Sequence, residues 1–349
     1  MNKHPNNPAP RRRHVRIAAQ ILFLLLLVAG TALILRKHSA ERFQTSEGTV
    51  FGTLYKIDYV YAAPLDSAIM AELRKVDMSL SMFNPASTVS RINRNESQET
   101  DTLFREVYRI ADRVAEETGG AYDITVAPLV NVWGFGTTQR ADVTQQQLDS
   151  IAAFVGYRNV RMSGTLFQKA DRRVQLDFSS VAKGYGVDRV ARLFDSLHIR
   201  DYMIEIGGEV VVKGLHPEGR PWIIGISKPA DAGSPGSGEV QQTLSITQTA
   251  MATSGNYRRF YERNGKRYAH TIDPVSGYPV QHNLLSATVF APDCATADAY
   301  ATAFMVMGLE KARAFLKRQP ELMAYFIYTD ADGKYREWHS DELDKYLQH

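Results

Sequence analysis

The chain has 349 residues, 44% of them hydrophobic and 23% charged, a composition typical of a globular protein with one large domain or two smaller ones. Its formal net charge of +3 comes partly from a basic N-terminal cluster, so the nearly neutral remainder does not favour nucleic acid as a partner. The single cysteine, Cys294, excludes an intramolecular disulfide and any multi-cysteine zinc or iron–sulfur site.

A basic segment followed by an apolar one opens the chain. Residues 1–16 are rich in arginine, and residues 17–35 form an apolar run long enough to cross a membrane as a helix, since about 20 residues suffice. Because more positive charge precedes the run than follows it, we predict a single transmembrane anchor in the inner membrane. Residues 1–16 would then be cytoplasmic, and the body would follow a linker at 36–47 on the periplasmic side. A cleaved signal peptide is the alternative, because residues 29–32 are small.

Periodic patterns predict the elements in the first part of the body, which runs from residue 48 to 349. Apolar residues alternate with polar ones in strands and recur every three or four positions in helices. In chain order we predict a strand over 49–61 centred on Gly52, a helix over 63–79, a helix over 102–118, a short helix over 145–155, a strand over 173–177, a helix over 180–197 and a strand over 202–212.

The second part of the body is marked by turn residues as much as by periodicity. We predict a surface loop over 227–239, a hairpin over 258–272 turning at Asn264-Gly265, helices over 296–307 and 311–319 broken near Gly308, and a closing hairpin from 324–329 and 335–338. Strands and helices interleave without a regular βαβ rhythm, so the sequence predicts a mixed α+β fold rather than a doubly wound one.

Glycines and aromatic residues lie together in the segment 119–128, which continues to Trp133-Gly134-Phe135-Gly136. Glycines let the backbone approach a flat ligand closely, and neighbouring rings can stack on it. The alternative interpretation is a buried turn with Trp133 and Phe135 in the core.

The segment 177–186 crosses a predicted strand-to-helix junction. A helix N-terminus there would offer free N–H groups and a positive dipole end to a pyrophosphate, and Lys183 would add a charge. Asp177 could accept from a ligand amide or hydroxyl. Gly184 and Gly186 each cost a helix roughly 1 kcal/mol relative to alanine, so they need a reason. Close packing against a neighbouring element would be one.

The segment 270–279 follows Ser254-Gly255-Asn256-Tyr257 and is rich in polar residues, proline and glycine. Loops of this kind commonly frame a ligand. The same residues would also form an ordinary pair of turns, so a structural role stays open.

Asp298 and Thr302 are spaced i,i+4 and therefore lie on one face of the predicted helix 296–307. A hard cation such as Mg²⁺ takes a few oxygen ligands from protein and the rest from phosphate and water. The alternative is that Asp298 only caps a helix or interacts with its dipole.

Taken in order, these blocks resemble the ApbE family of FAD:protein FMN transferases. The shared patterns extend over about residues 48–308 and are Gly-Ala-Tyr-Asp…Pro-Leu-Val…Trp-Gly-Phe-Gly, Asp-Phe-Ser-Ser…Lys-Gly-Tyr, Ile-Gly-Gly-Glu, Ser-Gly-Asn-Tyr, His-Thr-Ile-Asp-Pro…Ser-Gly-Tyr-Pro and Ala-Asp-Ala-Tyr-Ala-Thr. The resemblance implies a T-fold-like α+β architecture with FAD in a cleft. It also implies Mg²⁺-dependent transfer of FMN to Ser or Thr of a flavoprotein through a phosphoester bond, with release of AMP. Flavoprotein subunits of membrane electron-transport complexes are the acceptors that it suggests.

The resemblance also assigns roles by position. It places Asp298 and Lys183 in catalysis, with Asp298 orienting or deprotonating the incoming hydroxyl. FAD would contact Phe51, Phe83, Ala121, Tyr122, Asp123, Asp177, Lys183, His270, Thr271 and Ile272. Mg²⁺ would be held by Ser180, Asp298 and Thr302.

Some positions depart from the family pattern. The family often has Met at position 51 and Tyr or Trp at position 83, and Glu205 stands where an amide or small residue is commoner. Two other functions remain open from sequence. One is an FAD pyrophosphatase that uses water as acceptor, and the other is an extracytoplasmic FAD-binding protein without catalysis.

Overall fold

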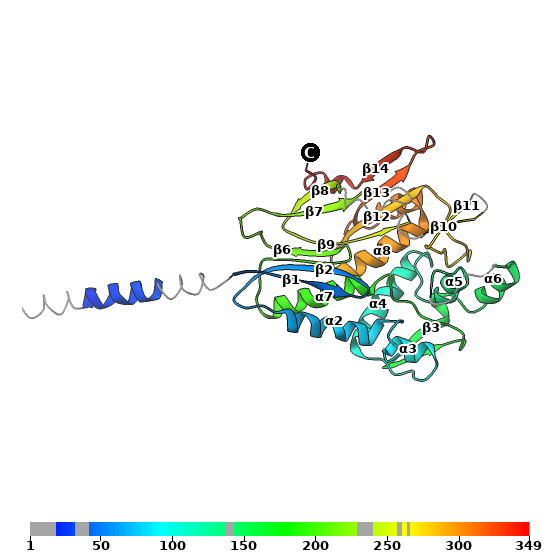
Figure 1. Cartoon of the computed structure of the whole chain (residues 1–349), viewed down its shortest axis with the longest axis horizontal. Coiled ribbons are helices and arrows are strands. Elements are labelled where there is room, and N and C mark those ends of the chain that lie inside the picture. Colours follow the sequence, from blue (N-terminus) through cyan, green and yellow to red (C-terminus); the bar gives the residue numbers. More distant parts are fainter. Residues whose placement is uncertain are drawn as a thin grey trace, which may run out of the picture.

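The computed structural model describes residues 19–31, 42–136, 143–228, 240–256, 260–263 and 266–348. Its centre is an eight-stranded antiparallel sheet in the order β1-β2-β5-β6-β9-β12-β13-β14 (Figure 1). The strands are β1 (Arg42–Val50), β2 (Thr53–Tyr61), β5 (Tyr202–Ile206), β6 (Glu209–Lys213), β9 (Gln248–Gly255), β12 (Leu284–Ala291), β13 (Met323–Thr329) and β14 (Tyr335–His339). Together with the helices below, this sheet confirms the mixed α+β fold.

Helices cover one face of the sheet, and a two-stranded ribbon covers the other (Figure 1). On the helical face, Ile57 and Ile204 of the sheet pack in one cluster with Leu73 of α2 and Val190 of α7. The helices are α2 (Asp66–Leu80), α3 (Thr88–Asn93), α4 (Thr102–Glu117), α5 (Ala127–Val132), α6 (Gln145–Ala152), α7 (Ala182–Ser196), α8 (Cys294–Met307) and α9 (Leu309–Leu316). The ribbon is β7 (Trp222–Ser227) with β8 (Val240–Ile246), and the smaller hairpins are β3 (Val160–Ser163) with β4 (Leu166–Lys169) and β10 (Phe260–Arg263) with β11 (Lys266–Ala269).

Both faces of β6 are covered, which explains its sequence. Val210 and Val212 pack under the β7–β8 ribbon, whereas Val211 packs on the helical side. A strand buried on both faces is apolar at successive positions, because successive side chains point to opposite faces. Glu209 is on the same side as Val211, so it is a carboxylate that points at the helices.

Two predicted single strands are hairpins. The segment 49–61 is divided between β1 and β2 by a turn at Phe51 and Gly52, whose φ angles are +52° and +74°. The segment 202–212 is divided between β5 and β6 by Gly207 and Gly208, both with positive φ. In each case the two short strands share one apolar pattern, so periodicity cannot detect the reversal. In addition, β1 begins at Arg42 and therefore lies partly inside the predicted linker 36–47.

One prediction of a strand was wrong. The segment 173–177 forms only an isolated bridge, between Gln175 and Val126. Its alternating pattern arises because Val174 and Leu176 enter the core from an irregular segment. The sequence patterns also missed the strands β3, β4, β7, β8, β9 and β12 and the short helices α3 and α5.

The remaining predicted elements are confirmed within a few residues at each end. They are the helices α2, α4, α6, α7, α8 and α9 and the hairpins β10–β11 and β13–β14. Most of the predicted loop 227–239 and the turn Asn264-Gly265 lie outside the described residues.

The predicted anchor is described only in part. Residues 19–31 are helical, and their apolar side chains between Ile21 and Val28 are exposed. The rest of the predicted span 17–35 lies outside the described residues. Within the part of the chain that is described, no helix has both the length and the apolar character needed to cross a membrane.

Candidate functional site

The helices α7 and α8 touch backbone to backbone at Gly184. A Cβ atom on Gly184 would lie 2.3 Å from the carbonyl oxygen of Cys294 and 2.9 Å from the nitrogen of Ala295. Gly186, half a turn later, faces the ring of Phe51, which would lie 2.7 Å from an added Cβ. Close packing, the alternative raised from sequence, therefore explains both glycines.

This close approach brings the Asp298 carboxylate to the N-terminus of α7. Asp298 is 4% exposed, and its Oδ2 accepts a hydrogen bond of 3.1 Å from the Gly184 N–H. The helix terminus predicted to receive a pyrophosphate thus already holds a carboxylate, so Asp298 of α8 acts as a cap for α7. The other oxygen, Oδ1, makes no hydrogen bond to the described residues and is not fully enclosed.

A buried ion pair lies beside Asp298. Lys183 donates from Nζ to Oε1 of Glu209, whose side chain is 1% exposed while that of Lys183 is 30% exposed. Burial disfavours the charged form of Lys183, but the carboxylates of Asp298 and Glu209 outweigh it and raise the pKa of Lys183. Burial likewise raises the pKa values of Glu209 and Asp298, and Lys183 opposes both shifts.

Glu209 was missed as a site residue from sequence. The available signal was a carboxylate that directly follows a Gly-Gly turn and opens an otherwise all-valine stretch, 210–212. Its pairing with Lys183 depends on the packing of β6 against α7, which no local pattern records.

Tyr122 and Ser180 join the same region. The hydroxyl of Ser180 donates to the Tyr122 hydroxyl at 3.2 Å, and Tyr122 is 1% exposed. Burial raises the pKa of Tyr122, and the nearby carboxylates of Asp298 and Asp177 add to the shift. The structure therefore brings together Tyr122, Ser180, Lys183 and Asp298 from three separate sequence blocks.

Asp123 and Asp177 accept hydrogen bonds mainly from nearby backbone N–H groups. Asp123 is buried, its Oδ1 accepts from the N–H and hydroxyl of Thr125, and its Oδ2 accepts from the Tyr157 N–H at 2.6 Å. Asp177 accepts from the Ser179 N–H at 2.8 Å and is partly exposed. The carboxylate of Asp123 is thus occupied on both oxygens, whereas that of Asp177 keeps room for a ligand.

The segment 270–272 is fixed from both sides. The Thr271 hydroxyl donates to Asn256 Oδ1 at 2.5 Å, and Ile272 is buried in the cluster that also holds Tyr122. The ring of His270 lies 6.4 Å from that of Phe135. Trp133 donates from Nε1 to the Gly277 carbonyl at 2.8 Å, so the loop 270–279 and the segment ending at 136 support one another.

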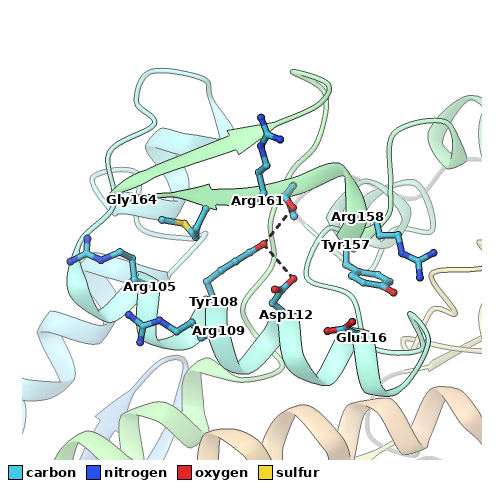
Figure 2. Close-up of a pocket in the computed structure, with 11 residues that line it drawn as sticks. Arg105, Tyr108, Arg109, Asp112, Glu116, Tyr157, Arg158, Arg161 and Gly164 are labelled. Carbon is cyan, nitrogen blue, oxygen red and sulfur yellow. Dashed lines mark hydrogen bonds between the residues drawn. The ribbon is translucent and has the colours of Figure 1, made fainter.

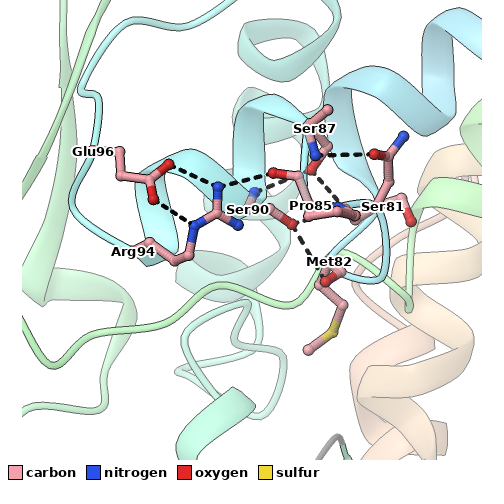
Figure 3. A network of polar contacts seen from close by, with 9 residues as sticks. Ser81, Met82, Pro85, Ser87, Ser90, Arg94 and Glu96 are labelled. Carbon is pink, nitrogen blue, oxygen red and sulfur yellow. Dashed lines mark hydrogen bonds and ion pairs between the residues drawn. The ribbon is translucent and has the colours of Figure 1, made fainter.

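Phe83 belongs to the loop between α2 and α3, and polar contacts hold that loop (Figure 3). The hydroxyl of Ser87 donates to the Ser81 carbonyl at 2.6 Å, and Arg94 donates to the Pro85 carbonyl at 2.9 Å. Phe83 itself is 72% exposed. An exposed ring on a fixed loop suits a flat partner, because little loop ordering would oppose the contact. Of the two predicted aromatic contacts, Phe51 packs against α7, whereas Phe83 stands in solvent.

A separate groove of about 550 Å³ lies between α4 and the β3–β4 hairpin (Figure 2). On its floor, Tyr108 donates to Asp112 and to the Val160 carbonyl, both at 3.4 Å. None of the predicted site residues lines it. Its polar rim is formed by Arg105, Arg109, Asp112, Glu116, Arg158 and Arg161. The buried charges described above therefore lie at the α7–α8 crossing and not in this groove.

The donor set at the crossing suits a hard cation. Asp298 supplies a carboxylate oxygen that no described residue engages, and Ser180 and Thr302 supply hydroxyls. Mg²⁺ favours a few oxygen ligands of this kind and keeps water or phosphate on its other positions. Among the described residues, no group of three or more His, Cys, Asp or Glu side chains is placed to bind a metal.

Asp188 fixes the start of α8 and so the position of Asp298. It is buried and accepts from the N–H groups of Cys294 and Ala295, both at 2.9 Å. Burial, reinforced by Asp293, raises the pKa of Asp188 from 3.8 to about 7.

This shift predicts a pH dependence of stability. Between about pH 4 and 7 the folded protein keeps a proton on Asp188 that the unfolded chain releases, so stability falls as pH rises and levels off above pH 7. Asp188→Asn removes this titration, and its free energy of unfolding is expected to change less over the same window. Urea unfolding at several pH values measures the difference. Equal pH slopes in both proteins would contradict the prediction.

The chain resembles a set of known flavin transferases over nearly its whole length. A sequence model described as the ApbE family matches residues 51–326. A protein of Vibrio cholerae named FAD:protein FMN transferase is 37% identical over 336 residues, covering 93% of this chain and 96% of the relative. One of the same name from Haemophilus influenzae is 37% identical over 300 residues, covering 81% of this chain and 86% of the relative.

Solved structures of flavin transferases are also similar to this chain. The flavin transferase ApbE from Vibrio cholerae has a TM-score of 0.78 and 35% identity, covering 88% of this chain and all of the other. The apo form of the Pseudomonas stutzeri flavinyl transferase ApbE has a TM-score of 0.78 and 30% identity, covering 87% of this chain and 96% of the other.

Proposed function

This chain belongs to the ApbE family, and from that membership we propose that it is an FAD:protein FMN transferase. The enzyme moves the FMN half of FAD to a Ser or Thr hydroxyl of an acceptor protein through a phosphoester bond and releases AMP. The observation that carries the proposal is the cluster of Lys183, Glu209, Ser180 and Asp298 at the crossing of α7 and α8. A partly buried lysine beside hard oxygen donors is the chemistry that phosphoryl transfer needs.

Each residue of the cluster has a distinct task. The Lys183 ammonium binds the pyrophosphate and stabilises the charge that develops as AMP leaves. Asp298 orients or deprotonates the incoming hydroxyl and is also a proposed ligand of the metal. Mg²⁺, held by Asp298, Ser180 and Thr302, would neutralise phosphate charge when bound.

The flavin half is positioned by the surrounding elements. Phe51, beside α7, and Phe83 offer apolar ring faces to the isoalloxazine. Contacts with Ala121, Tyr122, Asp177 and the segment 270–272 complete the site, with Asp123 fixing the loop through its two occupied oxygens. Binding energy gained far from the phosphorus then holds the reacting atoms in place.

The function is tested by incubating residues 42–349 with FAD, Mg²⁺ and a candidate acceptor domain. Mass spectrometry of the acceptor is expected to show an FMN-sized adduct on Ser or Thr. Release of free FMN and AMP without an adduct would instead establish an FAD pyrophosphatase. Binding of FAD with no product would leave only an FAD-binding protein.

The role of Phe83 gives a second test. Because the side chain is 72% exposed, Phe83→Ala is expected to leave the unfolding midpoint unchanged. It should weaken FAD binding about fivefold, the size of a ring contact worth about 1 kcal/mol. Flavin fluorescence measures the dissociation constant. Phe43→Ala, another exposed ring, is the control and should bind FAD normally. An unchanged FAD affinity in Phe83→Ala would remove Phe83 from the site.

The location of the enzyme is also part of the proposal. Residues 17–35 anchor the body to the inner membrane, with residues 48–349 in the periplasm, because the apolar run is preceded by more positive charge than follows it. Flavoprotein subunits of membrane electron-transport complexes are the proposed acceptors. Protease treatment of spheroplasts tests this orientation, since only a periplasmic body would be degraded.

A further inference from the structure

We propose that Glu209 is a positioning residue that holds Lys183 away from Asp298 and thereby keeps one Asp298 oxygen available for a divalent cation. This inference rests on the proposed function, because it concerns the same site. Glu209 itself would not bind the cation.

The charges around Lys183 support this role of Glu209. Two buried carboxylates, Glu209 and Asp298, act on a single ammonium, that of Lys183. The ammonium bonds to Glu209, while Asp298 is bonded by a neutral N–H group of Gly184. If Glu209 lost its charge, the nearest carboxylate for Lys183 would be Asp298. Opposite charges attract strongly in a buried site, so the ammonium would occupy the oxygen that a cation needs.

The surroundings of the Glu209 carboxylate also support this role. Its Oε2 is buried and forms no hydrogen bond with any described residue. A buried carboxylate oxygen without a partner is costly, so its presence needs an explanation beyond packing. A glutamine would have a similar shape, and its burial would carry a smaller free-energy cost of desolvation. A carboxylate at this position is explained if it is needed to hold Lys183.

The Glu209 side chain points toward the helices from a rigid strand. Alternation along β6 places Glu209 on the same face as Val211, toward α7 and α8, whereas Val210 and Val212 face the β7–β8 ribbon. The sheet is therefore a fixed base for the carboxylate, and Gly184 fixes α8 against α7. Glu209 and Asp298 thus approach Lys183 from two different rigid elements.

The test is the affinity for Mn²⁺ or Mg²⁺ in the absence of FAD, measured by calorimetry or by Mn²⁺ electron paramagnetic resonance. Glu209→Gln is expected to weaken cation binding about tenfold, as a partly buried charge interaction of this kind would. The double variant Glu209→Gln with Lys183→Met should return to near the affinity of Lys183→Met alone, because no ammonium is left to occupy Asp298. Glu209→Asp should retain part of the affinity.

The double variant separates this role from plain electrostatic attraction. If Glu209 acted only as a negative charge, its loss would weaken binding equally with and without Lys183. Glu205→Gln is the matched control, since Glu205 lies in the same hairpin on β5 and lacks a contact with Lys183, and its cation affinity should be unchanged.

Two results would overturn the inference. One is normal cation binding by Glu209→Gln, and the other is a double variant as weak as Glu209→Gln alone. A wild-type protein that binds no cation would end both this inference and the metal part of the proposed function. Transfer of FMN by the wild-type protein, scored separately by mass spectrometry, keeps the two failures distinguishable. Circular dichroism confirms that each variant is folded.

Discussion

Replacing Asp298 with alanine is expected to reduce FMN transfer by about 10³-fold, while most of the FAD binding remains. The carboxylate has one oxygen fixed by the Gly184 N–H and the other open to the site, so its removal takes away both the proton acceptor and the proposed cation ligand. The proposed flavin contacts lie on other elements and are expected to stay intact. Transfer is measured by adduct formation on the acceptor, and FAD affinity by flavin fluorescence.

Asp298→Asn is the matched variant for this experiment. Its amide oxygen can still accept the hydrogen bond from Gly184, so the packing of α7 on α8 is kept while the charge is lost. We expect the same loss of transfer as in the alanine variant. Full turnover in either variant would exclude the proposed role of Asp298.

Replacing Gly184 with alanine is expected to destabilise the protein by about 3 kcal/mol or more. In a helix, alanine is more favourable than glycine by about 1 kcal/mol, so helix propensity alone predicts that this substitution stabilises the protein. The added Cβ would lie 2.3 Å from the Cys294 oxygen and 2.7 Å from its carbonyl carbon, and these backbone atoms cannot turn aside as a side chain can. The helices must separate, which also withdraws Asp298 from α7. Denaturant unfolding measures the loss of stability, and cation binding measures the loss of the site.

Gly186→Ala is the control on the same helix. Its Cβ would meet the ring of Phe51, 2.7 Å away, and a ring at a hairpin tip can shift. We expect the free energy of unfolding to change by less than about 1 kcal/mol, since the better helix propensity of alanine offsets part of the steric cost of the contact with Phe51. Equal stability of the Gly184→Ala protein and the wild type would show that α7 and α8 are not held at this distance.

Strongly periodic segments and two hairpins were predicted well, whereas the reversals at 51–52 and 207–208 were missed. The helix α4 has Phe104, Val107 and Val114 on one buried face, a spacing visible in the sequence alone. The hairpin turn at Phe51-Gly52 was missed, because the residue before the glycine is an aromatic in a left-handed conformation. The segment 173–177 was misassigned because buried irregular chain can alternate in polarity as a strand does.

The sequence by itself determined the family and the mixed fold, because ordered motifs of this length do not recur by chance, and it predicted Lys183, Ser180 and Asp298 as site residues. Only the tertiary structure decided how those groups are used. In the folded protein, Asp298 accepts a hydrogen bond at the N-terminus of α7 and both oxygens of Asp123 accept hydrogen bonds. Lys183 forms an ion pair with Glu209. These contacts join residues that lie far apart in the chain, such as positions 184 and 298. They depend on which faces pack together, and a local pattern carries no record of its distant partner.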